Sequence, residues 1–256
     1  MALLLLALPL VSLSASPSSA DALTRALYEL QPAPQLVVFA TGGGMQLAPM
    51  LLSTPGASRA VLDVQLPYSR SSLVQLLGGR EPASFCSADV AYDLAAVAFE
   101  RARALNAEEQ QQQQQDADAD VGVDAESAVP QSPSPIVGLG CTAALRSEPM
   151  NRGPHRCYVA VRTAAGTLSL ELTLAKGARS RAAEDAVVSR VALVALAHAC
   201  SVEGAPPPGG IDAAAFWQLA PDEDAASRSS SSGGAEVGVE ASVASERLAV
   251  TFRPTR

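Results

Sequence analysis

The chain has 256 residues, of which 48% are hydrophobic, so it is long and apolar enough to bury a core. Its net charge is −8 at pH 7, and its basic residues do not gather in one stretch, which argues against nucleic acid as a main partner. The four cysteines lie far apart and the two histidines are not spaced as ligands. We therefore expect reduced thiols, no metal site and no cofactor.

The first 20 residues, MALLLLALPLVSLSASPSSA, combine a short apolar run with small residues. This pattern is typical of a secretory or organellar leader, but the basic start of such a leader is missing. The run is too short to span a bilayer as a helix, so we expect no membrane anchor. A cleaved leader, an apolar extension and a wrongly assigned start site all stay open, with a cytoplasmic or organellar location favoured.

The next segment predicts a helix, a strand and a glycine turn. Asp21 is the expected cap of a short helix that must end before two prolines. Gln35–Ala40 is an apolar run typical of a strand, and Thr41-Gly42-Gly43-Gly44 leads directly into a helical pattern. Further elements are expected as a strand at 59–66, a short helix at 68–77 and a long amphipathic helix that Ser87 caps.

Residues 106–135 change character to a glutamine run followed by Asp/Ala and Ser-Pro stretches, which predicts a disordered insertion. After it, a turn at 164–166 predicts a hairpin between strands at 157–162 and 167–174. An amphipathic helix over about 183–200 closes the domain. Residues 203–256 are expected to form a flexible tail, with Phe216 and Trp217 as its bulky anchors.

Helices thus alternate with buried strands, and one hairpin adds an antiparallel pair. The pattern predicts an α/β fold, a three-layer α/β/α domain with a mixed sheet over residues 21–202. The glycine turn is its first candidate site, because N–H groups at the start of a helix attract phosphate. A tight strand-to-helix turn also needs glycines, so the turn alone leaves both interpretations open.

Several motifs in a fixed order add to this. They are Thr41-Gly42-Gly43, Pro55-Gly56-Ala57-Ser58, Pro67-Tyr68-Ser69, Ser87, Gly138-Leu139-Gly140, His155-Arg156, Lys176-Gly177-Ala178-Arg179 and Ser180-Arg181. With these motifs the sequence resembles the CinA C-terminal (nicotinamide-nucleotide amidase-like) family, and most closely a plant and algal branch in which such a domain precedes a nucleotidylyltransferase-like domain. The H-x-x-H nucleotide-transfer motif of that second domain does not occur in residues 1–256.

The resemblance implies a three-layer CinA-like fold and release of ammonia from nicotinamide mononucleotide by a serine nucleophile with a lysine base. Ser58 matches the nucleophile. The expected lysine position holds Leu73, and the expected assisting hydroxyl position in the Gly138–Gly140 turn holds Leu139. A serine hydroxyl needs a base within reach, so most of the catalytic unit is missing. Thr142 with Tyr68 and Ser69 could form another polar site.

We therefore expect a catalytically degenerate domain that binds a pyridine nucleotide or has a regulatory role. Thr41 to Gly44, Tyr68 and Ser69 are its expected ligand-binding residues, with Arg179 and Arg181 as counter-charges for phosphate. Two alternatives are an active amidohydrolase with a rearranged serine site and a protein-interaction scaffold. A homo-oligomer and a nucleotidylyltransferase are the expected protein partners. Of the histidines, we expect His155 at the surface or against ligand and His198 in the core.

Overall fold

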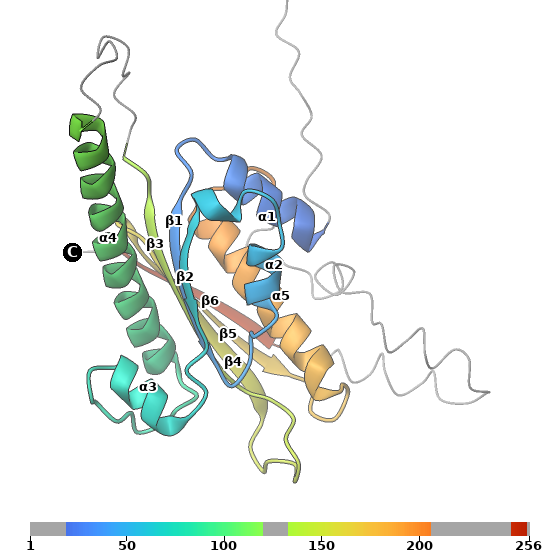
Figure 1. Ribbon diagram of the computed structural model, residues 1–256. Helices are drawn as coiled ribbons and strands as arrows, with labels where there is room; N and C mark the ends of the chain where they lie inside the picture. The colour runs from blue at the N-terminus through green and yellow to red at the C-terminus, as the bar shows by residue number, and fades with distance from the viewer. Residues whose placement is uncertain (1–18, 120–132, 206–246, 255–256) are drawn as a thin grey trace, which may run out of the picture.

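The computed structural model describes residues 19–119, 133–205 and 247–254, and its elements are labelled in Figure 1. Residues 1–18, and with them most of the expected leader, lie outside the described part, as do Phe216 and Trp217. Among the described residues, no helix has both the length and the apolar character needed to cross a bilayer.

A six-stranded mixed sheet forms the centre of the domain, in the order β2-β1-β3-β4-β5-β6. The first three strands in this order are parallel and the last three pair antiparallel. This confirms the predicted mixed sheet and the predicted hairpin. The strands are β1 (Gln35–Thr41), β2 (Val61–Gln65), β3 (Ile136–Ala144), β4 (His155–Arg162), β5 (Gly166–Leu174) and β6 (Arg247–Pro254).

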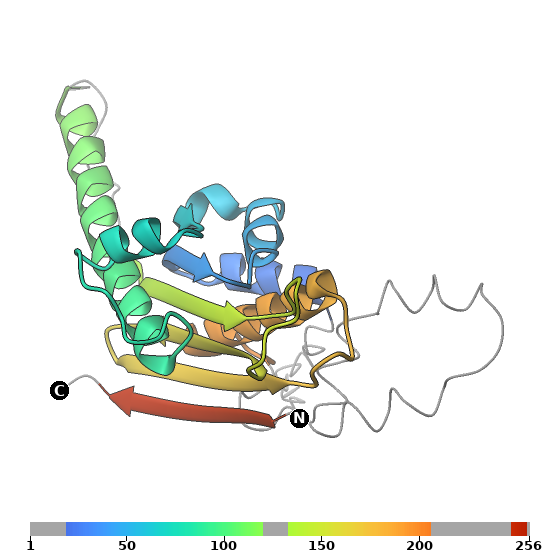
Figure 2. The same cartoon turned by 90° about the horizontal axis from the view of Figure 1, so that it is seen from below.

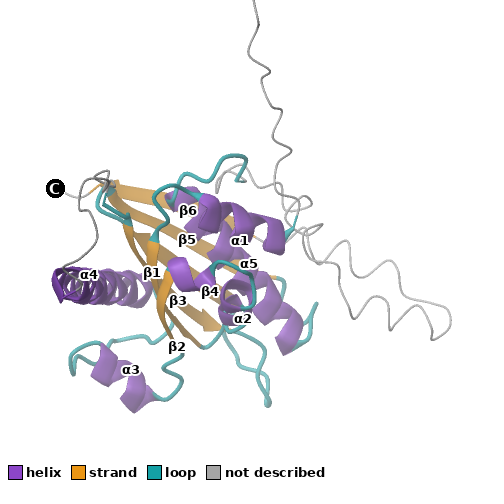
Figure 3. Cartoon of the chain, turned by 45° about the horizontal axis from the view of Figure 1, so that its top comes forward, coloured by secondary structure: helices purple, strands orange, loops and turns teal. Residues whose placement is uncertain are grey.

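Helices cover the two faces of this sheet and complete the α/β fold (Figures 2 and 3). One face carries α4, which packs mainly on β3, β4 and β1, and the other carries α5 with α1 and α2 beside it. The helices are α1 (Ala20–Glu29), α2 (Leu47–Leu52), α3 (Arg70–Leu76), α4 (Ala88–Ala119) and α5 (Arg181–Ala199), and Ala57–Arg59 forms a 3-10 turn, η1.

The largest core lies between the sheet and α5. Strand side chains alternate between the two faces, so β1 sends Val38 to the α5 side and Val37 to the α4 side. The helix α5 differs from its prediction, because it is buried nearly all round rather than amphipathic. Packing by α1 and α2 on its outer side explains this, since a helix enclosed on all sides can be apolar on all sides.

Gly138 and Gly140 do not form the turn that the motif comparison predicted. They lie within β3, where they face α4. A Cβ on Gly140 would lie 2.3 Å from the Ala91 carbonyl oxygen, and one on Gly138 would lie 2.1 Å from the Phe99 nitrogen. These glycines therefore let the helix backbone approach the sheet closely, a packing role that needs no ligand.

Three boundaries also differ from the predictions. Ser19, not Asp21, caps α1, and its side chain accepts a hydrogen bond from Ala22 N. The glutamine run, expected to be disordered, continues α4 to Ala119, because Gln, Glu and Ala all favour helix. Residues 247–254, expected in the flexible tail, form β6 at the edge of the sheet. The domain therefore reaches beyond residue 202.

Candidate functional site: a cleft at the carboxyl edge of the sheet

Two loops leave the sheet side by side at the carboxyl ends of β1 and β3. The strands are parallel, and Thr41 of one pairs with Thr142 of the other. The glycine loop, residues 42–46, follows β1, and the β3–β4 loop, residues 145–154, follows β3. The first turn of α5 lies against both loops through the contacts described below. Ligand sites in α/β sheets commonly lie at this edge.

The glycine loop is already bound by the protein itself. Its two N–H groups before α2, those of Met45 and Gln46, donate to the carboxylate of Asp185 in α5, at 3.1 Å each. Gly42 has a φ of 73°, and a Cβ there would lie 2.0 Å from the Ala143 carbonyl oxygen. The glycines thus serve a left-handed turn and a close approach, and Asp185 takes the place expected for phosphate.

Thr41, Tyr68 and Ser69 lie at the same edge of the sheet. The Thr41 hydroxyl is buried and donates to the Pro67 carbonyl at 2.8 Å, which ties the end of β1 to the segment after β2. Tyr68 is 69% exposed, and Ser69 caps α3 by accepting from Ser72 N. Thr142, the alternative polar residue, is buried and donates to the Phe85 carbonyl. Both threonine hydroxyls therefore bind backbone.

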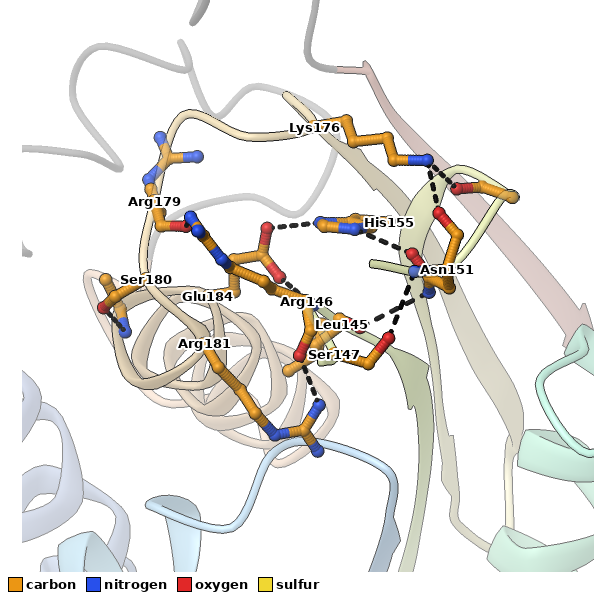
Figure 4. Close-up of polar contacts among 12 residues, drawn as sticks. Leu145, Arg146, Ser147, Asn151, His155, Lys176, Arg179, Ser180, Arg181 and Glu184 are labelled. Atoms are coloured by element: carbon orange, nitrogen blue, oxygen red, sulfur yellow. Dashed lines mark hydrogen bonds and ion pairs between the residues drawn. The ribbon is translucent and has the colours of Figure 1, made fainter. Parts of the chain in front are cut away.

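A cleft of about 500 Å³ opens beside these loops, at the start of α5 (Figure 4). Three guanidinium groups border it, those of Arg146, Arg179 and Arg181. Arg146 donates to the Arg179 carbonyl at 3.2 Å, and Arg181 donates to the carbonyls of Arg146 and Gly42 at 2.9 and 3.1 Å. The walls of the cleft are formed by Arg146, Ser147, Glu148, Gly177, Ala178, Arg179, Ser180 and Arg181. Arg179 and Arg181, predicted from sequence as a pair, do line one cleft.

A buried polar network supports this cleft from behind. His155 and Glu184 are fully buried and joined at 2.6 Å between Nδ1 and Oε1, while the second Glu184 oxygen accepts from Arg146 N at 2.7 Å. The other ring nitrogen of His155 lies 2.9 Å from the Asn151 amide oxygen. Both ring nitrogens thus lie within hydrogen-bonding distance of an oxygen, one of Glu184 and one of Asn151, and the ring is held at both ends.

This network reverses the expectation for the two histidines. His155 is fully buried, and His198, expected in the core, is exposed near the end of α5. The lone lysine, Lys176, completes the loop, because its ammonium donates to the carbonyls of Asn151, Arg152 and Gly153. Lys176 is therefore held by backbone oxygens and belongs to the wall of the β3–β4 loop rather than to a catalytic pair.

Ser58 lies away from the cleft. It is exposed in η1, next to the amino end of β1, where Leu36 N donates to the Ala60 carbonyl. The strand from Gln35 to Thr41 spans about 20 Å, so Ser58 and the glycine loop lie at opposite edges of the sheet. The structure does not bring Ser58 together with the other predicted site residues.

The two leucines at the expected catalytic positions belong to the core. Leu73 is 2% exposed and packs in the cluster that contains Val37 and Phe39, while Leu139 is fully buried in β3. Burial also raises the pKa of the Cys141 thiol, behind the glycine loop, well above its usual value. The thiol stays protonated and is not a nucleophile at ordinary pH. Within the described ranges, no group of three His, Cys, Asp or Glu could hold a metal ion.

Arg146, Ser147 and Glu184 were not predicted as site residues. Nothing in the sequence marks Arg146, because its position depends on where the β3–β4 loop returns to α5. Glu184 did carry a signal, since it precedes Val188 and Val191 by four and seven residues and so lies on an apolar stripe of the helix. An acidic residue on such a stripe requires a buried partner.

The fold and the cleft define an α/β domain with a mixed sheet and an arginine-lined cavity at the carboxyl edge. No protein-family model and no curated protein matches the sequence. Among solved structures the chain is similar to proteins of the competence-damaged protein (CinA) superfamily. One from Escherichia coli shares 14% identity at a TM-score of 0.47, covering 71% of this chain and 91% of its own.

Two further solved structures are similar to this chain. A CinA superfamily protein from Enterobacter cloacae shares 13% identity at a TM-score of 0.44, covering 72% of this chain and 91% of its own. The competence/damage inducible protein CihA from Agrobacterium tumefaciens shares 15% identity at a TM-score of 0.46, over 74% and 98%.

Proposed function

We propose that this chain is a CinA-like domain that binds a pyridine nucleotide in the arginine-lined cleft and does not hydrolyse it. The observation that carries the proposal is the meeting of Arg146, Arg179 and Arg181 around one cavity in a chain whose net charge is −8. A guanidinium group offers five donors, so an arginine that binds one or two carbonyls keeps others for a phosphate.

The size and position of the cleft support a small phosphorylated ligand. Its volume of about 500 Å³ lies within the range of small-molecule sites. Ser180 caps α5 there, and the positive end of the helix dipole faces the same space. The ligand site that we propose therefore lies at Arg179 and Arg181, and is displaced from the glycine loop, whose N–H groups bind Asp185.

The absence of hydrolysis is proposed from the positions of the missing groups. Ser58 lies at the far edge of the sheet from the cleft, and Leu73 and Leu139 are core residues that offer no base. Loss of a general base commonly lowers a rate by about 10² to 10⁴. We expect ammonia release from nicotinamide mononucleotide to be equally low for the wild type and Ser58→Ala. Brisk release that Ser58→Ala abolishes would support the amidohydrolase alternative instead.

Calorimetry with nicotinamide mononucleotide tests binding, and nicotinamide riboside, which lacks the phosphate, is the matched ligand. We expect the nucleotide to bind with a Kd of roughly micromolar to millimolar, and the riboside to bind at least about tenfold more weakly. The double variant Arg179→Ala, Arg181→Ala should weaken nucleotide binding to the level of the riboside.

The control for that variant is Arg70→Ala, Arg103→Ala, which removes the same charge from two exposed ion pairs away from the cleft. It should leave binding unchanged. Equal losses in both double variants would reduce the effect to net charge and contradict a built site. No binding of either ligand would favour the scaffold alternative.

The closer likeness to the plant and algal branch belongs to the same proposal, and with it a nucleotidylyltransferase as partner and self-association of this domain. Co-elution of the chain with such an enzyme in size-exclusion chromatography is the expected result. Separate elution at micromolar concentrations of both proteins would contradict the partnership.

A further inference from the structure

The outermost strand of the sheet on the side opposite β2 is β6, and it forms a second surface of interest. This strand pairs antiparallel with β5 along one side, from Arg247 against Thr173 to Pro254 against Gly166. Within the described residues no strand pairs with its other side. An unpaired edge presents N–H and C=O groups that can accept another strand.

The α4 side of this edge carries four arginines and two acidic residues, Asp89 and Glu171. Thr251 and Arg253 line a groove there with Tyr92 of α4, and alternation along the strand places Arg247 on the same side. The pairing of β4, β5 and β6 sets Arg156 in the row of Arg247, and Arg162 in the row of Arg253. Four arginines thus mark the corners of one sheet face, although they are scattered in the sequence.

These arginines lack acidic partners. Among the described residues none of the four makes an ion pair, whereas five other arginines do. Arg156, Arg162 and Arg253 instead lie over the rings of Tyr158, Phe99 and Tyr92, at 5.6 to 5.9 Å from the ring centres. Ring contacts orient a guanidinium group without neutralising it, so the four arginines outweigh Asp89 and Glu171 and the face keeps a net positive charge.

The opposite side of the edge is apolar and incompletely covered. Leu248 and Val250 are half-buried against the α5 core, and Phe252 is 58% exposed. A strand added next to β6 would place alternate side chains on this side, where apolar residues would cover Phe252. Its remaining side chains would lie on the basic side.

We propose that β6 binds an extended peptide segment in which acidic and apolar residues alternate, by adding it as a seventh strand. Acidic residues six positions apart would face Arg253 and Arg247. A second copy of this chain does not fit, because full antiparallel overlap of two β6 strands about Val250 sets Arg247 of one opposite Arg253 of the other. Like charges directly opposite each other destabilise a strand pair.

The probe is a capped heptapeptide, EVEVEVE, with its fluorescence anisotropy measured on the full chain. Two peptides serve as controls, KVKVKVK, in which the charge is reversed, and EEEEVVV, in which the alternation is lost. We expect binding of EVEVEVE alone, together with slowed hydrogen exchange at the β6 amides. The double variant Arg247→Glu, Arg253→Glu should weaken it by about tenfold or more and should bind KVKVKVK instead.

The exchange of preference shows that the variant still folds, and a far-ultraviolet circular dichroism spectrum like that of the wild type is the second check. Three outcomes would overturn the proposal. The first is that EEEEVVV binds as tightly as EVEVEVE. The second is that a single-stranded oligothymidylate competes as well as the peptide. Either result would make the face a general polyanion-binding surface. Amides of β6 that are protected on both edges before any peptide is added would show that the molecule itself fills the edge.

Discussion

Two consecutive residues of α5, Glu184 and Asp185, each hold one of the two loops at the carboxyl edge. The two residues differ in how deeply they are buried. Glu184 holds the β3–β4 loop from a fully buried position, through Arg146 N and His155. Asp185 holds the glycine loop from a half-buried position, through Met45 N and Gln46 N. In both cases a carboxylate accepts hydrogen bonds from backbone N–H groups of a loop. We therefore expect burial to decide how much each contact contributes to stability.

Arg181 joins the two loops, since one guanidinium group donates to Gly42 and to Arg146. Three charged residues near the start of α5, Arg181, Glu184 and Asp185, thus hold the loops beside the cleft. Breaking a buried pair lowers the free energy of unfolding strongly, because the remaining partner has no water to bind. Breaking an exposed contact lowers it little, because water replaces the lost partner. Substitutions of the buried Glu184 and of the more exposed Asp185 and Arg181 can distinguish the buried contacts from the exposed ones.

The largest effect is expected for Glu184→Ala. It leaves the His155 ring and the Arg146 N–H buried without their acceptor, which should cost about 3 to 5 kcal/mol in the free energy of unfolding. Urea denaturation of the variant measures this. Asp185→Ala is the matched comparison, one residue along the same helix, and equal losses in the two variants would contradict the role given to burial.

The next effect is expected for Gly42→Ala. The residue has a positive φ, and its new Cβ would lie against the Ala143 carbonyl, so we expect a loss of roughly 2 to 3 kcal/mol. Gly78→Ala is the control, because Gly78 also has a positive φ but no atom within 4 Å of the added Cβ. Its loss should be about 1 kcal/mol. Similar losses would mean that the approach to Ala143 is not tight.

The two loops also differ in how far the sequence predicts them. The glycine loop was predicted as a turn between strand and helix, and it is one, because glycines between an apolar strand and a helical pattern have few other uses. Its expected ligand was not supported, since Asp185 lies about 140 residues away and only the fold brings it to the loop. The β3–β4 loop had no local signal that pointed to a cleft.

The same limit explains the other differences. Strands and helices with clear periodicity, such as β1 and α5, were predicted, and the mixed sheet followed from them. The motif comparison predicts a turn at Gly138 and Gly140, because the sequence does not show which atoms lie next to a glycine in the folded protein. The strand β6 was missed behind a long polar segment, although Leu248, Val250 and Phe252 alternate as an edge strand requires.

A moderate effect is expected for Asp185→Asn. The amide keeps one acceptor oxygen but loses the charge, so one of the two loop N–H groups loses its partner. We expect a loss of about 1 kcal/mol in stability, and faster hydrogen exchange at Met45 and Gln46 than at Arg146. Exchange that accelerates equally at all three amides would show that the two loops open together.

The smallest effect on stability is expected for Arg181, which is exposed. Arg181→Ala should cost less than about 1 kcal/mol, because water can replace an exposed donor. Its effect on the cleft should be larger than its effect on stability, since the planar fork of one guanidinium group spans the carbonyls of Gly42 and Arg146. A lysine ammonium keeps the charge but lacks that fork. Arg181→Lys should therefore weaken the binding of nicotinamide mononucleotide nearly as much as Arg181→Ala does, with both melting temperatures close to that of the wild type. If Arg181→Lys binds like the wild type, charge alone accounts for the contribution of this residue, and the link between the two loops does not shape the cleft.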